Sequence, residues 1–138
     1  MTVFVDTSAW YAAADADDRS HEHAVGLLRQ FAGDLLTTDH VLVETWYLAR
    51  ARLGADTAER LVAGIRAGIA RIENTELSDL EVAAATAERF SDQDFSIVDR
   101  TSWSTMIRLG IHEAIAFDRD YSIFRYGPRG DRAFVVHT

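Results

Sequence analysis

The stretch that decides the fold is Thr2-Val3-Phe4-Val5-Asp6-Thr7-Ser8, in which a short apolar run ends in a carboxylate. Residues 2–5 are too few for a helix and are mostly β-branched or aromatic, which predicts a buried strand. We expect residues 6–14 to form a helix directly after it. In an open parallel sheet, ligands collect beyond the carboxyl ends of the strands, so Asp6 lies where a binding site is expected.

Short apolar segments alternate with helical patterns along the rest of the chain. Further strands are predicted at residues 35–38, 71–74, 114–117 and 133–136. Helical spacing, capping boxes at Ser78–Glu81 and Ser96–Asp99, and stops at Gly54 and Gly110 predict helices at residues 21–31, 38–53, 56–70, 78–90 and 96–109. Because strands that alternate with helices form parallel sheets covered on both faces, we expect an α/β fold with a mostly parallel sheet of four to five strands.

Length and composition limit the class of protein. A chain of 138 residues with 48% hydrophobic content is long enough for one domain with a single core and too short for two. It has no apolar stretch of membrane-spanning length and no basic leader, so we expect a cytoplasmic protein that contacts no membrane. The chain has no cysteine, which leaves oxygen and imidazole as metal ligands and favours hard cations such as Mg²⁺ or Mn²⁺.

Charge narrows the function further. The formal net charge of −8 argues against a broad basic surface for nucleic acid, so any such contact must be local. All 14 basic residues are arginine. Receiver-type phospho-acceptors and haloacid-dehalogenase-like phosphatases also place aspartates at the edge of a parallel sheet, but both need a lysine. The chain has none, which counts strongly against both.

Two aspartates end apolar runs that lie far apart in the sequence. Asp118 follows residues 114–117 as Asp6 follows residues 2–5, so the parallel sheet should make the two neighbours. Taken singly, Asp6 could be no more than the N-cap of the next helix, and Asp118 no more than a turn former. A fold that gathers several buried anions must bring in a cation or lose stability, which points to a metal site.

Glu44 is predicted to point inward. On a helical projection it lies in the middle of a stripe formed by Val41, Tyr47, Leu48 and Ala51. A carboxylate on such a stripe is expected to face the core and not the solvent.

Asp99 has two possible roles. It is the third position of the capping box that begins at Ser96, which is by itself a sufficient reason for an acid. It also shares a helical stripe with Ser102, Trp103 and Met106, so its side chain can face the sheet edge. The helix N-terminus favours negative charge there, and the two roles can coexist.

Ordered motifs spanning nearly the whole chain resemble those of PIN-domain ribonucleases, most closely VapC-type toxins. They are Val-Phe-Val-Asp6-Thr7-Ser8-Ala-Trp at the start, Glu44 in the helix after the second strand, Phe-Ser-Ile-Val-Asp99-Arg-Thr-Ser102, and Leu-Gly-Ile-His-Glu-Ala-Ile-Ala-Phe-Asp118-Arg-Asp120-Tyr. The resemblance implies a single PIN domain over residues 1–138, built as a three-layer α/β/α sandwich.

The resemblance also implies an activity and a site. We expect Mg²⁺- or Mn²⁺-dependent cleavage of RNA phosphodiester bonds by water, leaving a 5′-phosphate and a 3′-hydroxyl. The metal-binding and catalytic quartet carried over from the family is Asp6, Glu44, Asp99 and Asp118. Possible accessory residues are Ser8, Ser102 and Asp120, the last matching an acidic position that is optional in the family.

We also expect specific protein partners and local contacts to the RNA substrate. A cognate antitoxin should hold the toxin in check, and we expect the chain to form a homodimer. Arg100 and Arg119 are candidates for contacting RNA, although each alone is more often a solvated surface charge. Arg100 stands where relatives commonly have a small residue. The alternative function is a catalytically silent PIN-fold module that binds a protein partner, and retention of all four acids argues against it.

Overall fold

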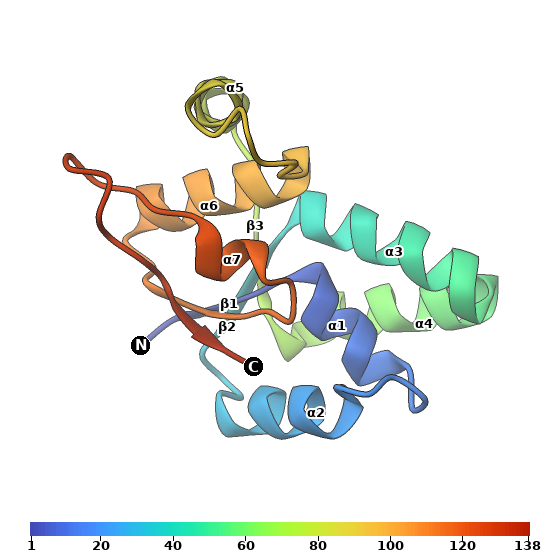
Figure 1. Cartoon of the computed structure of the whole chain (residues 1–138). Coiled ribbons are helices and arrows are strands. Elements are labelled where there is room, and N and C mark those ends of the chain that lie inside the picture. Colours follow the sequence, from blue (N-terminus) through green and yellow to red (C-terminus); the bar gives the residue numbers. More distant parts are fainter.

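The computed structural model describes residues 1–138 and is built on a five-stranded sheet in which all neighbouring strands are parallel (Figure 1). The strands, in the spatial order β3-β2-β1-β4-β5, are β1 (Val3–Val5), β2 (Leu35–Thr38), β3 (Arg71–Glu73), β4 (Glu113–Ile115) and β5 (Val135–His137). Strand β1 lies at the centre and is fully buried. Since the chain order reverses on its two sides, the carboxyl ends of β1 and β4 lie side by side at a switch point of the topology.

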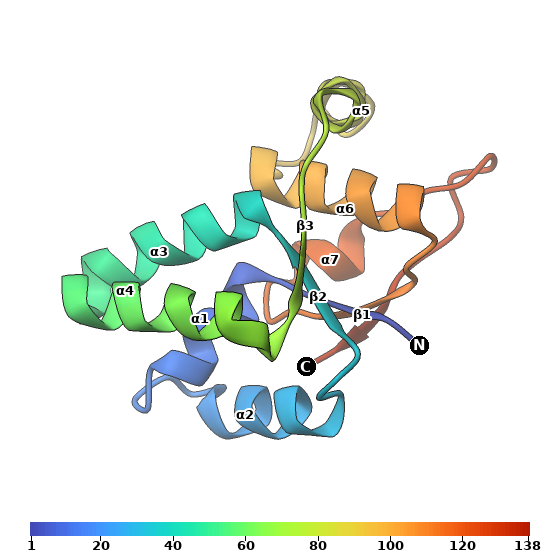
Figure 2. The ribbon, with the colours of Figure 1, turned by 180° about the vertical axis from the view of Figure 1, so that it is seen from behind.

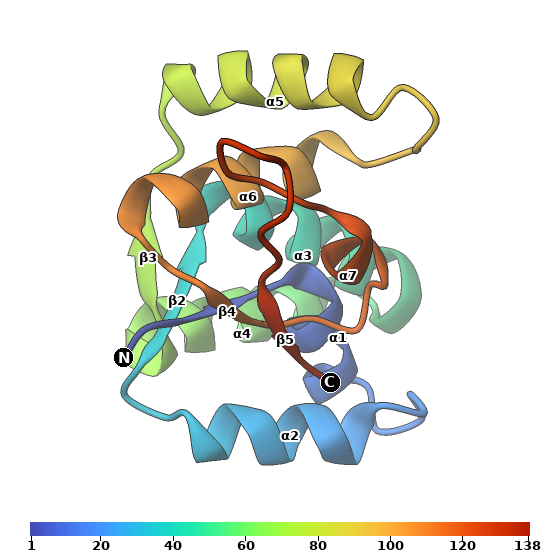
Figure 3. The same cartoon turned by 60° about the vertical axis from the view of Figure 1, so that its left-hand side comes forward.

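Helices cover both faces of the sheet, so the predicted three-layer α/β fold is confirmed. They are α1 (Thr7–Ala14), α2 (His21–Gln30), α3 (Asp39–Leu53), α4 (Ala55–Gly64), α5 (Leu77–Arg89), α6 (Ile97–Leu109) and the short α7 (Asp120–Ile123). Helix α6 lies on one side of the sheet with α5 stacked outside it, and α2 lies on the other side (Figure 3). None of these helices combines the length and the apolar character needed to cross a bilayer.

The edge strand β3 connects two helices on opposite sides. Helix α4 runs into a π-helical turn, η1 (Ile65–Ile69), which is broken at Gly68 by a φ of 123°. The chain then passes through β3 to α5, as Figure 2 shows from behind. The break explains why the helix predicted over residues 56–70 gives way to a strand at Arg71, because only glycine adopts that φ at low cost.

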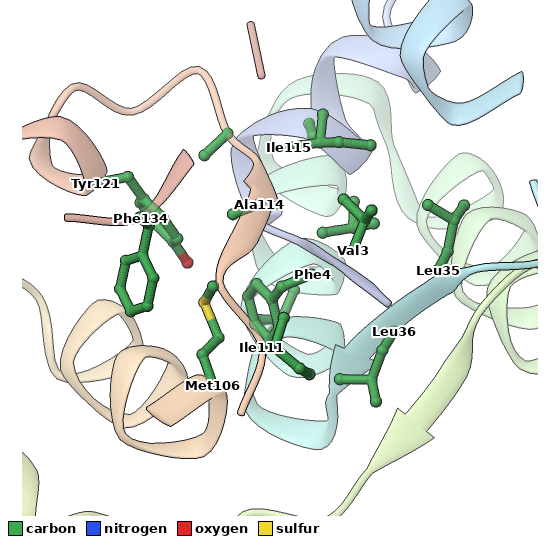
Figure 4. Close-up of a cluster of buried hydrophobic side chains, with 14 of the residues drawn as sticks. Val3, Phe4, Leu35, Leu36, Met106, Ile111, Ala114, Ile115, Tyr121 and Phe134 are labelled. Carbon is green, nitrogen blue, oxygen red and sulfur yellow. The ribbon is translucent and has the colours of Figure 1, made fainter. Parts of the chain in front are cut away.

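A continuous core of 23 buried residues joins the sheet to its helices (Figure 4). Neighbouring strands contribute Phe4, Leu36 and Ala114, all fully buried, and α6 adds Met106. Each large apolar side chain buried in this way stabilises the fold by about 1.5–3 kcal/mol relative to exposure. Tyr121 of α7 belongs to the same cluster, although it carries a hydroxyl group.

Two predicted boundaries shift for identifiable reasons. Helix α5 begins at Leu77, not Ser78, because the capping contact is made by Asp79, whose Oδ2 accepts from the backbone N–H of Glu76 at 2.9 Å. The last two predicted strands, residues 114–117 and 133–136, are Glu113–Ile115 and Val135–His137 in the structure. The backbone N–H of Phe117 donates to Ser8 Oγ at 2.9 Å instead of to a neighbouring strand, so the chain leaves the sheet before Asp118.

Candidate metal centre

Asp6 is held in place by neutral donors on both of its oxygens. It is 2% exposed and caps α1, as its Oδ2 accepts from the backbone N–H of Ser8 at 3.1 Å and from Ser8 Oγ at 2.6 Å. Tyr121 donates its phenolic O–H to Oδ1 at 3.1 Å. The capping role and the inward-facing carboxylate therefore coexist.

Burial and mutual repulsion perturb the pKa values of the two most enclosed acids of the site, Asp6 and Asp99. Burial raises the pKa of Asp6 to about 6, against the hydrogen bonds from Ser8 and Tyr121, which lower it. Asp99 is 4% exposed, and burial, followed by the charges of Asp6, Asp118 and Glu44, raises its pKa to about 9. A raised pKa means that the ionised carboxylate is unfavourable in its surroundings because no positive charge balances it, and a bound cation would supply that charge.

Asp118 and Asp120 complete a cluster with Asp99. One carboxylate oxygen of each of the three lies within 4.8 Å of the others. Asp118 also forms a turn, since its Oδ1 accepts from the backbone N–H of Asp120 at 2.9 Å. Burial and the neighbouring charge of Asp118 raise the pKa of Asp120.

Glu44 reaches the same site, but the predicted reason for its orientation is wrong. The proposed inward stripe fails because Tyr47 is 66% exposed and Ala51 is also exposed. The buried face of α3 is instead formed by Val41, Leu42, Thr45 and Ala49. Glu44 lies at the border of that face and is half-buried, so its carboxylate faces the edge of the site and not the core.

These acids line one open hollow of about 450 Å³ beyond the carboxyl ends of the strands. Its lining consists of Asp6, Thr7, Ser8, Glu44, Leu48, Asp94, Ser96, Asp99, Asp118 and Asp120, with no lysine, arginine or histidine. The quartet carried over from the family is thus brought together, with Ser8 and Asp120 beside it. Asp94 was not predicted, because it lies in an irregular loop where no periodicity marks a side chain as facing a site.

The other predicted residues fall in different places. Ser102 is fully buried on α6, and it does not line the hollow. Arg100 does not line the hollow, because its Nη1 donates to the carbonyl of Ala83 at 2.7 Å and its Nε to the carbonyl of Phe95 at 3.2 Å. Arg119 is exposed, between the two acids of the turn.

The donor set fits a hard divalent cation. Mg²⁺ and Mn²⁺ prefer carboxylate oxygens and retained water, and six carboxylates converge on the hollow without a basic side chain to neutralise them. The residues present are therefore suited to hold such an ion.

Comparison with known proteins identifies the class. Residues 3–125 match the model of the PIN domain. The 23S rRNA-specific endonuclease VapC20 of Mycobacterium tuberculosis is 36% identical over 120 residues, which cover 87% of this chain and 92% of the relative. The chain therefore belongs to the PIN domain family. Within that family its relatives are VapC proteins, among them ribonuclease VapC26 of M. tuberculosis, 26% identical over 97% of this chain and 98% of the relative.

Solved structures agree with the sequence comparison. A crystal structure of M. tuberculosis VapC20, described as a sarcin-ricin loop cleaving toxin, superposes with a TM-score of 0.84 and 34% identity, covering 88% of this chain and 94% of that chain. A DNA-bound VapBC structure from Salmonella typhimurium gives a TM-score of 0.60 at 13% identity, covering 84% and 85% of the two chains, and supports the fold alone. The predicted resemblance to VapC-type PIN domains is confirmed.

Proposed function

We propose that this protein is a divalent-metal-dependent endoribonuclease, the toxin of a toxin-antitoxin pair. The observation that carries the proposal is the convergence of six carboxylates on one hollow that contains no basic side chain. Two of the six, Asp6 and Asp99, are buried, and buried anions surrounded by further acids destabilise a fold unless a cation binds among them, so a metal site best explains their presence. The relationship to VapC ribonucleases supplies the reaction class.

Asp6, Asp99 and Asp118 are the residues we assign to hold the ion, with Glu44 at the edge of the hollow. Asp120, whose carboxylate lies within 4.8 Å of those of Asp99 and Asp118, is a further candidate ligand, and the exposed Asp94 is assigned to the water molecules that the ion retains. A bound Mg²⁺ or Mn²⁺ would lower the pKa of a water molecule and stabilise negative charge on the phosphorus centre during in-line attack. We expect a 5′-phosphate and a 3′-hydroxyl as the products.

The surrounding side chains orient the carboxylates of the site. Ser8 fixes Asp6 and at the same time accepts from the backbone N–H of Phe117, so it ties the end of β1 to the segment that leads to Asp118. No histidine lines the hollow, and the proton of the attacking water must therefore pass to a carboxylate or to solvent.

The substrate we propose is structured ribosomal RNA. VapC20, the 36% identical relative, is specific for 23S rRNA. A net charge of −8 favours recognition of a folded RNA by shape over attachment through a broad basic surface. A protein with that substrate would act in the cytoplasm, and we propose an antitoxin and a second copy of this chain as its protein partners.

The test is cleavage of ribosomal RNA by the purified protein in Mg²⁺ or Mn²⁺, with EDTA and Asp6→Asn as the two controls. We expect one or a few cuts that both controls abolish. Mapping of the RNA ends distinguishes 5′-phosphate from 5′-hydroxyl products. If the protein cuts no RNA and calorimetry detects no divalent-ion binding, the nuclease proposal fails and the silent binding module takes its place.

A further inference from the structure

Tyr121 is a fully buried tyrosine whose hydroxyl group contacts Asp6, one of the acids of the hollow. Its ring packs edge-on against Trp103, with centroids 5.5 Å apart, inside the aromatic cluster beneath the hollow. Its phenolic O–H donates to Asp6 Oδ1 at 3.1 Å. A phenylalanine would fill the same space, so packing accounts for the ring but not for the hydroxyl.

The Tyr121 contact completes the fixing of the Asp6 carboxylate. Ser8 supplies two donors to Oδ2, and Tyr121 supplies the donor to Oδ1. A carboxylate offers about four lone-pair directions and these three donors occupy three of them, so one direction on Oδ1 stays free for a ligand. Both donors are neutral and orient the carboxylate without cancelling its charge, whereas an arginine in their place would compete with a cation.

The same residue also anchors the turn that carries two other acids. Tyr121 follows Asp120 directly, and its backbone N–H donates to the carbonyl of Asp118 at 3.3 Å. The hydroxyl therefore ties the Asp118–Asp120 turn to the end of β1, across 115 positions of sequence. Without that contact, the turn and the Asp6 carboxylate would each have more freedom.

We propose that Tyr121 is a positioning residue for the metal site: its hydroxyl holds the Asp6 carboxylate and the Asp118–Asp120 turn in the arrangement that binds the divalent ion. The inference rests on the proposed function, because it concerns the same site. Partners that orient a metal ligand typically change affinity or activity by about 10- to 100-fold when they are removed.

The experiment replaces Tyr121 with phenylalanine and measures Mn²⁺ binding to the full chain by calorimetry. We expect a melting temperature in EDTA close to that of the wild type and Mn²⁺ affinity weakened by about tenfold. Cleavage should be reduced at low Mn²⁺ and restored at high Mn²⁺, which a merely structural defect would not produce. Tyr126→Phe is the matched control, since Tyr126 is also buried but its hydroxyl lies 3.2 Å from His112 Nδ1 instead of donating to a carboxylate of the site.

Three results would overturn the inference while leaving the nuclease intact. The first is an unchanged Mn²⁺ affinity in Tyr121→Phe, and the second is an equal loss of Mn²⁺ affinity in Tyr126→Phe. The third is a Tyr121→Phe protein that no longer folds in EDTA, because the hydroxyl would then be required by the fold itself. If the wild-type protein itself neither binds Mn²⁺ nor cuts RNA, the proposed function fails first.

Discussion

Replacing Asp99 with asparagine should stabilise the metal-free protein while it removes metal-dependent cleavage. Asp99 is 4% exposed, and its carboxyl has a pKa of about 9 in the folded protein against an ordinary value of 3.8. A raised pKa means that the folded state binds the proton more tightly than the unfolded state. The metal-free fold therefore loses stability as the pH rises from about 4 toward 9.

The size of the effect follows from that shift. Each pH unit above the ordinary pKa costs ~1.4 kcal/mol, so the full cost at pH 7.5 is at most about 5 kcal/mol. Local relaxation and the cost of burying an amide reduce the benefit of the substitution to about 1–3 kcal/mol. For a chain of this length, that corresponds to a melting temperature higher by roughly 3–10 °C.

The assay is thermal unfolding in EDTA at pH 7.5 and at pH 5, with Asp79→Asn as the matched control. Asp79 is an equally buried acid, but it accepts from Arg108 Nη2 at 2.9 Å and Ser104 Oγ at 2.7 Å, which lower its pKa against the effect of burial. We expect Asp99→Asn to melt above the wild type and Asp79→Asn below it. The reasoning is refuted if Asp99→Asn is the less stable protein at pH 7.5, or if its advantage does not shrink at pH 5.

Three further predictions concern other contacts of the chain. Asp79→Asn should lower the free energy of unfolding by about 2–3 kcal/mol at neutral pH, because Arg108 loses its buried charged partner. A carboxylate with a lowered pKa stabilises the fold only while it is ionised, so denaturant titrations should show the difference from the wild type shrinking as the pH falls below about 4. A difference that stays constant with pH would contradict this. Ser8→Ala should weaken Mn²⁺ binding measured by calorimetry roughly tenfold, and unchanged affinity would count against its role at Asp6. Arg100→Ala should lower the melting temperature by a few degrees and leave the KM for RNA unchanged, because its guanidinium binds backbone carbonyls. Arg119→Ala should instead raise the KM for RNA. The reverse pattern would show that Arg100 contacts RNA and Arg119 supports the fold.

Much of the fold could be predicted from local patterns. The β-branched run at residues 2–5, the cap at Ser96 and the stops at Gly54 and Gly110 each act over a few residues, and the structure confirms them. The start of α5 was predicted one residue too late, although its capping contact between Asp79 and the backbone N–H of Glu76 is also local. It depends on Asp79, which is held by Arg108 from the neighbouring helix α6, a contact between residues 29 positions apart.

The candidate metal site was likewise only partly predictable from local sequence patterns. The sequence by itself determined that Asp6 and Asp118 meet, because residues that end parallel strands lie at one edge of the sheet, and the absence of lysine counted strongly against competing phosphoryl chemistry; Glu44 and Asp99 joined them through the family resemblance. Only the tertiary structure decided the side chains around them: Glu44 at the edge instead of the core, Asp94 within the hollow, Arg100 turned away, and Tyr121 bonded to Asp6. The physical reason is that periodicity fixes the face of an element on which a residue lies, whereas the packing between elements fixes which atoms come within hydrogen-bonding distance.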